Sequence, residues 1–201
     1  MDPLFEDLPE RVLTDRLVLR CPCAADAALM NAAVCESIDD LRSTMLWAQT
    51  PPSMAQSEAD CRRFQARFLL REDATLFMFE RLAGDREGAF IGGAGMHRID
   101  WAVRRFEIGY WCRLSMQGRG YVTEAVRSLT AHAFERLGAQ RVELRMNHDN
   151  DRSRRVAERA GFELEGVLRN IAQNPQGELR DTRVYALTRA PGAAAGSGAG
   201  G

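Results

Sequence analysis

Apolar and polar positions along the first part of the chain alternate between strand and helix periods. The segment 16–20 alternates and stops before Pro22, which predicts a strand. An alanine-rich segment over 24–37 has apolar residues at helical spacing, and 38–47 predicts a second short helix that Pro51 and Pro52 bring to an end. Ser57, with Asp60 three residues on, resembles a capping box and predicts a helix that runs to about Arg71.

From Ala74 onward the period of the apolar residues changes to two. Strands are predicted over 76–79, 90–101 and 103–114, with a turn at 84–88, so that they form an antiparallel meander. The second of these strands contains Gly92, Gly93 and Gly95. Glycines inside a strand predict a bend or a close approach of another backbone.

The last part of the chain predicts alternating helices and strands. These are a helix over 123–137 stopped by Gly138, a strand over 141–146, a helix over 151–160, and strands over 162–171 and 178–187. Asn150 or Asp149 is the expected cap of the second helix, and Gly161 its stop. This order predicts one mixed α/β domain with a single sheet over 14–189. Residues 1–13 are expected to be an N-terminal extension, and 190–201, rich in Ala and Gly, a disordered tail.

The composition excludes several kinds of partner and mechanism and leaves the predicted fold unchanged. The chain has 201 residues, 45% apolar and 27% charged, with a formal net charge of −1 and mixed signs, which argues against nucleic acid as a main partner. It contains no lysine, which excludes a nucleotide P-loop and a Schiff-base mechanism. No apolar run has the length of a membrane span and no signal peptide is recognisable, so a cytoplasmic protein without a membrane partner is expected.

The five cysteines are scattered. Cys21 and Cys23 are separated by one residue, whereas redox and zinc pairs have two, and no histidine lies near them at ligand spacing. Reduced thiols and no metal are therefore expected.

The segment 115–125, S-M-Q-G-R-G-Y-V-T-E-A, lies between a predicted strand and a predicted helix. Gly118 and Gly120 allow a backbone with positive φ and lack the Cβ atoms that would keep a ligand away. The free N–H groups and the dipole of the following helix favour a bound phosphate. The segment is therefore predicted to hold the pyrophosphate of a cofactor.

A dinucleotide is the first alternative for this loop. The fingerprint of dinucleotide-binding folds requires a third glycine, where this chain has Thr123, and an acidic residue at the end of the next strand, whereas Glu143 lies in the middle of it. The loop also follows antiparallel strands. These departures argue against a dinucleotide.

An ordered set of short motifs resembles the GNAT acetyltransferases, and within them the RimJ/RimL-type branch. The motifs are Q-G-R-G-Y-V-T-E-A at 117–125, R-L-V-L-R at 16–20, E-I-G-Y-W at 107–111, N-D-R-S at 150–153, A-G-F at 160–162 and E-G-V-L-R at 165–169. Arg180, Asp181, Tyr185 and Leu187 complete the set. One departure is Val122, which stands where the family has Gly or Ala and is expected to move the backbone slightly away from the pyrophosphate.

The resemblance implies transfer of an acetyl group from acetyl-CoA to an amine, on a mostly antiparallel sheet whose two central strands splay apart. Backbone N–H groups of 111–114 would bind the pantetheine arm and the thioester oxygen, and Asn150 would orient that arm. Ser153 would donate a proton or hydrogen bond to the departing thiolate. The residues that the resemblance places at acetyl-CoA are Trp111, Cys112, Arg113, Leu114, Gln117, Gly118, Arg119, Gly120, Tyr121, Val122, Thr123, Asn150 and Ser153.

A general base has to take a proton from the attacking amine. Glu107 is the first candidate, and His97, His148 and Asp181 are weaker ones; Glu107 is equally well explained as a partner of Arg104 or Arg105. Lone histidines are more often structural or exposed than catalytic.

Among the remaining side chains, Trp111 is the tryptophan expected in the acceptor cleft, ahead of Trp47 and Trp101. Cys112 is the nucleophile of an alternative two-step mechanism. This mechanism is disfavoured because no histidine that could activate the thiol is recognisable from the spacing in the sequence. The arginines at 152, 154 and 155 are interpreted as a solvated helix face that reaches the 3′-phosphate of CoA.

A protein N-terminal α-amine is the first-choice acceptor under this resemblance, and a small-molecule amine, an antibiotic or a polyamine, is the second. A non-catalytic acyl-CoA-binding module is a third possibility, for which Val122 is the only hint in the sequence. A monomer or a homodimer is compatible with the sequence.

Overall fold

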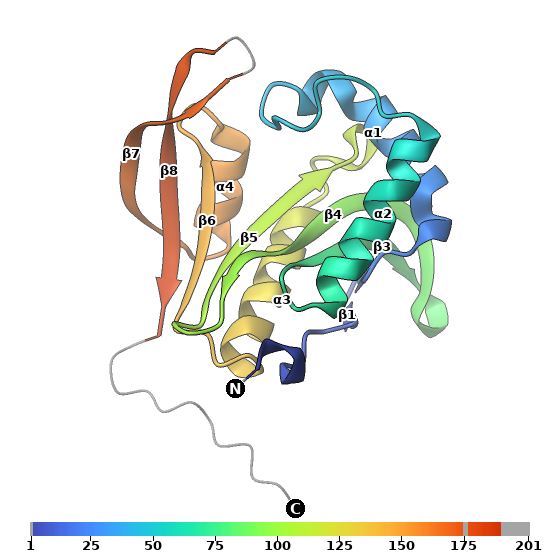
Figure 1. Ribbon diagram of the computed structural model, residues 1–201, viewed down its shortest axis with the longest axis horizontal. Coiled ribbons are helices and arrows are strands. Elements are labelled where there is room, and N and C mark those ends of the chain that lie inside the picture. The colour runs from blue at the N-terminus through green and yellow to red at the C-terminus, as the bar shows by residue number, and fades with distance from the viewer. Residues whose placement is uncertain (1, 175–176, 190–201) are drawn as a thin grey trace, which may run out of the picture.

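One eight-stranded sheet organises the chain in the computed structural model, which describes residues 2–174 and 177–189 (Figure 1). The strands lie in the order β1-β2-β3-β4-β5-β6-β8-β7. Their bounds are β1 Arg11–Leu13, β2 Leu17–Arg20, β3 Ala74–Leu82, β4 Arg86–Asp100, β5 Arg105–Cys112, β6 Arg141–Asn147, β7 Glu163–Gln173 and β8 Leu179–Thr188. Every neighbouring pair is antiparallel except β5 and β6. The mixed, mostly antiparallel sheet that the sequence predicts is confirmed.

Helices cover both faces of this sheet. Helices α1 (Ala27–Leu41) and α2 (Met54–Leu69) lie on one face, and α3 (Tyr121–Glu135) lies on the other, with α4 (Asp151–Arg159) next to β6 (Figure 1). Two separate apolar clusters follow from this arrangement. Val34 and Ile38 of α1 pack in one cluster with Phe77, whereas Val126 and Leu129 of α3 pack in the other.

The parallel pair β5 and β6 is short. Its ladder joins Arg105, Phe106 and Glu107 to Arg141, Val142 and Glu143, and the two strands separate beyond these residues (Figure 1). The predicted splay of the central strands is therefore present. It opens the middle of the sheet at the C-terminal ends of both strands.

The glycines of β4 allow close approaches of neighbouring backbone. A Cβ atom at Gly95 would lie 2.4 Å from the carbonyl oxygen of Ala74, and one at Gly92 would lie 2.3 Å from the carbonyl oxygen of Trp111. The ladder between β3 and β4 shifts register between Met78 and Phe79. The prediction of a bend or close packing at these glycines is confirmed.

Three elements of the first part of the chain differ from the prediction. The sheet begins with β1, inside the predicted N-terminal extension, because three residues are too few for a readable alternation. α1 is a single helix to Leu41, since Ile38 and Leu41 continue its buried side. α2 begins at Met54, where Ser53 and Gln56 form the capping box. Ser57 is not the cap: it is buried and its Oγ accepts a hydrogen bond from Asn31 at 3.1 Å.

The elements around the loop of 115–125 match the prediction more closely. Asn150 caps α4 with its side-chain oxygen, which accepts from the Ser153 N–H at 3.0 Å. Gly138 and Gly161 follow α3 and α4 with φ of 63° and 89°. The predicted tail at 190–201 lies outside the described residues. Within the described part of the chain, no helix has the length and apolarity to cross a membrane and no group of acidic, His and Cys side chains is arranged for a metal ion.

Candidate active site

Two cavities meet where β5 and β6 separate. The helix-side cavity, about 830 Å³, is bounded by α2 and the sheet and is lined by Trp47, Phe64, His97, Glu107 and Arg145 among others. The loop-side cavity, about 1160 Å³, is lined by residues 116–123 and by α4. Both cavities share the residues Thr44, Met45, Tyr110, Trp111, Asn150 and Ser153. A ligand in one cavity therefore faces a ligand in the other across this shared wall.

The loop at the start of α3 has the geometry of an anion site. Gly118 and Gly120 have φ of 76° and 81°, in the left-handed region, and a Cβ at Gly118 would meet no atom within 4 Å. The first turn of α3 leaves N–H groups without intrahelical acceptors. The Thr123 Oγ1 is buried and has no hydrogen-bond partner among the described residues. These open donors and the orphaned hydroxyl line the loop-side cavity and fit a bound pyrophosphate.

Val122, the departure from the family pattern, packs against the apolar cluster under α3. It is partly buried and also borders the loop-side cavity. Its side chain therefore contributes to the apolar core at the edge of the cavity. The sequence alone did not determine this orientation.

Gln117 connects three elements at the rim of the loop-side cavity. Its Nε2 donates to Asp40 Oδ2 at 2.8 Å and its Oε1 accepts from Arg152 at 3.2 Å. Arg152 in turn donates to Asp40 Oδ1 at 2.6 Å. The end of α1 is thus tied to the loop and to α4, and Asp40 is a site residue that its place in the α1 pattern did not reveal.

Backbone groups of β5 alternate between its two neighbours. The Arg113 N–H donates to Ile91 on the β4 side, whereas the Arg104 carbonyl accepts from Gln140 on the β6 side. By this alternation Tyr110 and Cys112 present their backbone to the gap left by β6. Of the predicted stretch 111–114, the N–H groups at 113 and 114 are already bound to Ile91 and to Ser37 Oγ.

Eleven of the thirteen predicted cofactor residues line the loop-side cavity, and Arg113 and Leu114 do not. Their amide hydrogens are used within the protein, so these two predictions find no support in the geometry. The donors that the gap offers come from 110 and 112 instead.

Tyr110 and Ser153 meet at the shared wall of the cavities. The Tyr110 hydroxyl donates to the Ser153 carbonyl oxygen at 3.5 Å. Burial raises the pKa of the Tyr110 phenol to about 12, against a smaller lowering by a hydrogen bond with the Ser153 side chain. Tyr110 therefore stays protonated near neutral pH and is a second hydroxyl at the shared wall, one that the sequence did not reveal.

Aromatic side chains form one side of the helix-side cavity. Trp111 packs edge-on against Trp47, with ring centroids 6.2 Å apart, and against Phe90 at 6.0 Å. Both tryptophans line the cavity, whereas the sequence favours Trp111 over Trp47 for the acceptor cleft. Trp101 lies elsewhere: it packs on Phe106 and donates to the Arg71 carbonyl oxygen.

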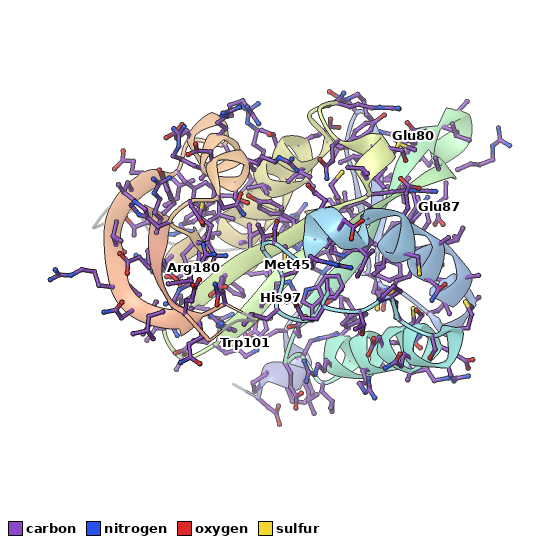
Figure 2. The ribbon with its side chains drawn as sticks, turned by 90° about the horizontal axis from the view of Figure 1, so that it is seen from above. Met45, Glu80, Glu87, His97, Trp101 and Arg180 are labelled. Atoms are coloured by element: carbon purple, nitrogen blue, oxygen red, sulfur yellow. The ribbon has the colours of Figure 1, made fainter. Side chains whose placement is uncertain are left out.

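The four candidate bases separate into two groups. Glu107 and His97 are directly opposite each other on β5 and β4, and both line the helix-side cavity. His148 and Asp181 line neither cavity and pair with each other through backbone atoms. Figure 2 labels His97 and Met45, two side chains of the helix-side cavity.

Each of the two remaining candidates has a charged partner. Glu107 accepts from Arg98 at 2.9 Å, rather than from Arg104 or Arg105 as the sequence suggests. His97 Nδ1 lies 2.8 Å from Asp73 Oδ2. Asp73 was missed because it precedes β3 and is far from His97 in the sequence.

Cys112 is free, as are the other four cysteines. Burial raises the pKa of its thiol to about 11. The thiol is therefore protonated near neutral pH, and the thiolate that a covalent acetyl-enzyme requires is scarce.

The comparisons with known proteins agree with this geometry. A family profile described as "Acetyltransferase (GNAT) domain" matches residues 16–163. The chain is 30% identical over 154 residues to the ribosomal-protein-serine acetyltransferase of Escherichia coli strain K12, covering 76% of this chain and 82% of that protein. It is 39% identical over 84 residues to the putative ribosomal N-acetyltransferase YdaF of Bacillus subtilis strain 168, covering 42% of this chain and 46% of YdaF, so this match spans less than half of that relative.

Among solved structures, the microcin C7 self-immunity acetyltransferase MccE in complex with acetyl-CoA and AMP superposes with a TM-score of 0.81 at 22% identity, covering 90% of this chain and 98% of that chain. This likeness shows a common fold. The profile covers most of the described residues, and the class of protein is an acyltransferase. The chain belongs to the GNAT acetyltransferases and is an N-acetyltransferase.

Proposed function

We propose that this chain transfers the acetyl group of acetyl-CoA directly to a primary amine, with a protein N-terminal α-amine as the first-choice acceptor. The observation that supports this most is the shared wall of the two cavities, where a thioester in the loop-side cavity faces an amine in the helix-side cavity. The name of the E. coli relative, a ribosomal-protein-serine acetyltransferase, supports a protein acceptor. MccE, whose structure contains acetyl-CoA, supports the choice of co-substrate.

The loop-side cavity binds the co-substrate in this proposal. The left-handed Gly118 and Gly120, the first turn of α3 and the Thr123 hydroxyl bind the pyrophosphate. The backbone N–H groups of Tyr110 and Cys112 donate to the pantetheine arm and to the thioester oxygen, and stabilise the negative charge that develops there. Asn150, at the cap of α4, fixes the wall on the opposite side.

A hydroxyl donor is needed at the sulfur as the thiolate leaves. Ser153 is the proposed donor, and Tyr110, hydrogen-bonded to it, is the second. Ser153→Ala is expected to keep acetyl-CoA affinity and to lower kcat, and Tyr110→Phe tests whether the phenol acts with it. Unchanged kcat in both variants would remove this pair from the mechanism.

Calorimetric titration with acetyl-CoA and CoA tests the co-substrate. Absence of binding to either would contradict the proposal and also the alternative of an acyl-CoA-binding module. Gly118→Val should strongly weaken the binding, whereas the same change at Gly138, which has a similar φ but lies outside both cavities, should not.

The acceptor is tested with a panel of peptides and small amines, read by mass spectrometry. Acetylation of peptide α-amines supports the first choice, whereas acetylation only of polyamines or aminoglycosides would move the function to a small-molecule acceptor. Binding of acetyl-CoA with no acetylated amine in the panel would favour the binding module.

A further inference from the structure

Three residues, one just before β3 and two on the neighbouring strands β4 and β5, form a line across the helix-side cavity. Asp73 precedes β3, His97 lies on β4 and Gly109 lies on β5. All three line the cavity. His97 lies between the other two, with one ring nitrogen toward each.

The Asp73 carboxylate is fixed on both oxygens. Its Oδ1 accepts from the Thr75 hydroxyl at 2.8 Å and its Oδ2 lies 2.8 Å from His97 Nδ1. Because an ionised carboxylate only accepts hydrogen bonds, Nδ1 carries the proton of the neutral ring, and Nε2 presents a lone pair.

Gly109 makes room for the other side of the ring. A Cβ atom at Gly109 would lie 2.8 Å from His97 Cδ2 and 3.1 Å from Nε2, so only glycine lets the ring lie against β5. The next residues of β5 are Tyr110 and Trp111, which form the shared wall with the loop-side cavity. The Nε2 edge of the ring therefore lies beside the strand that borders the reacting groups, in the same cavity as Tyr110 and Trp111.

Glu107 is differently placed. Its side chain is 15% exposed and its carboxylate is bound to Arg98 at 2.9 Å. An approaching ammonium group would have to share this carboxylate with the guanidinium. Among the described residues, the charged contact of the His97 ring is that of Asp73 with Nδ1, on the other side of the ring from Nε2.

We propose that His97 is the catalytic base of the transferase and that Asp73 and Gly109 are positioning residues that fix its tautomer and its place. This inference rests on the proposed function. An N–H proton of the acceptor ammonium passes to Nε2, which becomes an imidazolium. The freed nitrogen lone pair forms the C–N bond to the acetyl carbon as the C–S bond breaks, and the thiolate takes a proton from the hydroxyl donors at the shared wall. The N-protonated amide returns its second proton to the hydroxyl that protonated the thiolate, and His97 then releases its proton to solvent.

Other charged side chains line the same cavity as this ring. They come from four elements of the helix-side cavity: Asp60, Arg63 and Arg67 of α2, Arg98 of β4, Glu107 of β5 and Arg145 of β6. Asp60 is paired with Arg63, and Glu107 with Arg98. Asp73 is the charged group in direct contact with the ring.

The first measurement needs no acceptor. Nitrogen-15 spectra of histidine-labelled protein should show His97 with a protonated Nδ1 and an unprotonated Nε2 above the titration of the ring. Asp73→Asn should raise the population of the ring that is protonated on Nε2. A ring protonated on Nε2 in the unaltered protein would overturn the proposal.

The second measurement is the pH profile of acetyl transfer to the most reactive peptide of the panel. His97→Gln is expected to lower kcat at pH 7 by about 10²-fold, within the range for a lost general base, with the KM for acetyl-CoA unchanged. The loss should shrink toward pH 9, because the α-amine deprotonates on its own near pH 8. Asp73→Asn and Gly109→Ala should each lower kcat by about tenfold, and Glu107→Gln by less than that.

His148→Gln is the matched control, since His148 is exposed and lines neither cavity, and its kinetics should be unchanged. If the unaltered protein acetylates a peptide, and His97→Gln has the same kcat and the same fall in kcat at low pH, the assignment of the base is wrong while the proposed function stands. If no amine is acetylated although acetyl-CoA binds, the proposed function fails, and the base with it. Thermal unfolding of each variant separates loss of catalysis from loss of folding.

Discussion

The two cavities of the molecule are built in different ways. The loop-side cavity is made largely from two short continuous segments, residues 116–123 and the start of α4, whose backbone N–H groups and glycines provide the binding geometry. The helix-side cavity draws single side chains from segments far apart, from Met30 to Thr182. The first depends on backbone conformation and the second on side-chain placement by the whole sheet.

This difference separates what the family has in common from what an individual acceptor requires. A co-substrate with a constant pyrophosphate is bound by backbone groups that any sequence with the right glycines provides. An acceptor is recognised by side chains, such as Trp47 and Phe64, that change without changing the fold. Substitutions in the two cavities should therefore separate co-substrate affinity from acceptor kinetics.

The largest expected effect is at the left-handed glycines of the loop. Gly118→Val places a β-branched residue at φ 76° inside the loop-side cavity. We expect acetyl-CoA affinity to fall by about 100-fold, because either the backbone leaves the left-handed region or the valine side chain fills the site. Gly138→Val has the same backbone problem at φ 63°, after α3. Both variants should lose about 1–3 kcal/mol of unfolding free energy in urea titrations.

Equal loss of affinity in both glycine variants would mean that global destabilisation, and not the loop, explains the effect. Calorimetry at a temperature where both variants remain folded provides the comparison.

A smaller effect is expected at two threonines of α3. Thr123 and Thr130 both have buried hydroxyls without a partner among the described residues, but only Thr123 lines the loop-side cavity. Changing either to Val removes an unsatisfied hydroxyl, so the free energy of unfolding should stay the same or rise. Acetyl-CoA affinity should fall by about tenfold in Thr123→Val, the worth of one hydrogen bond to a charged group, and not in Thr130→Val.

If Thr123→Val binds acetyl-CoA as the unaltered protein does, the orphaned hydroxyl is a packing feature and the pyrophosphate is held by backbone alone. A fall in both variants would point to a change in α3 as a whole.

The same contrast between the two cavities explains which site residues could be predicted from the sequence. Gly118, Gly120 and Asn150 act through local geometry, a left-handed turn and a helix cap, so their types and spacing predicted their places. The pairing of Asp73 with His97 is set by the neighbouring strands β3 and β4, and no spacing rule connects two residues that tertiary structure brings together.

The errors in the helices have a similar cause. Ser57 and Asp60 are followed by a helical pattern, but Ser53 with Gln56 fits the capping box better, since the third residue should be Glu or Gln. That signal was present in the sequence. The direction of the Val122 side chain was not, because both the cavity and the apolar cluster accept a valine at the start of α3.

In the helix-side cavity, a moderate effect on the KM for the acceptor is expected from a substitution of Trp47. This residue is 55% exposed, and its ring packs edge-on against Trp111, an arrangement worth about 0.5–1.5 kcal/mol. Trp47→Ala should therefore raise the KM for the acceptor by about fivefold, with acetyl-CoA affinity unchanged, because Trp47 lines only the helix-side cavity. Initial rates at fixed acetyl-CoA, with the best peptide varied, measure this. A parallel loss of acetyl-CoA affinity would show that the two cavities are not separable at Trp111.

The smallest expected change concerns Cys112 and the direct-transfer mechanism. Burial raises the pKa of its thiol to about 11, so the protonated form dominates at neutral pH and the thiolate fraction grows about tenfold for each pH unit up to that value. Alkylation by iodoacetamide, followed by peptide mass spectrometry, should be slow at Cys112 at pH 7 and rise in this way, whereas the exposed Cys35 reacts first. Acetyl-CoA should slow the reaction at Cys112 by about threefold and leave Cys35 unaffected, because only Cys112 lines the loop-side cavity. Rapid alkylation of Cys112 at pH 7 would reveal a stabilised thiolate and return the two-step mechanism through an acetylated cysteine to consideration.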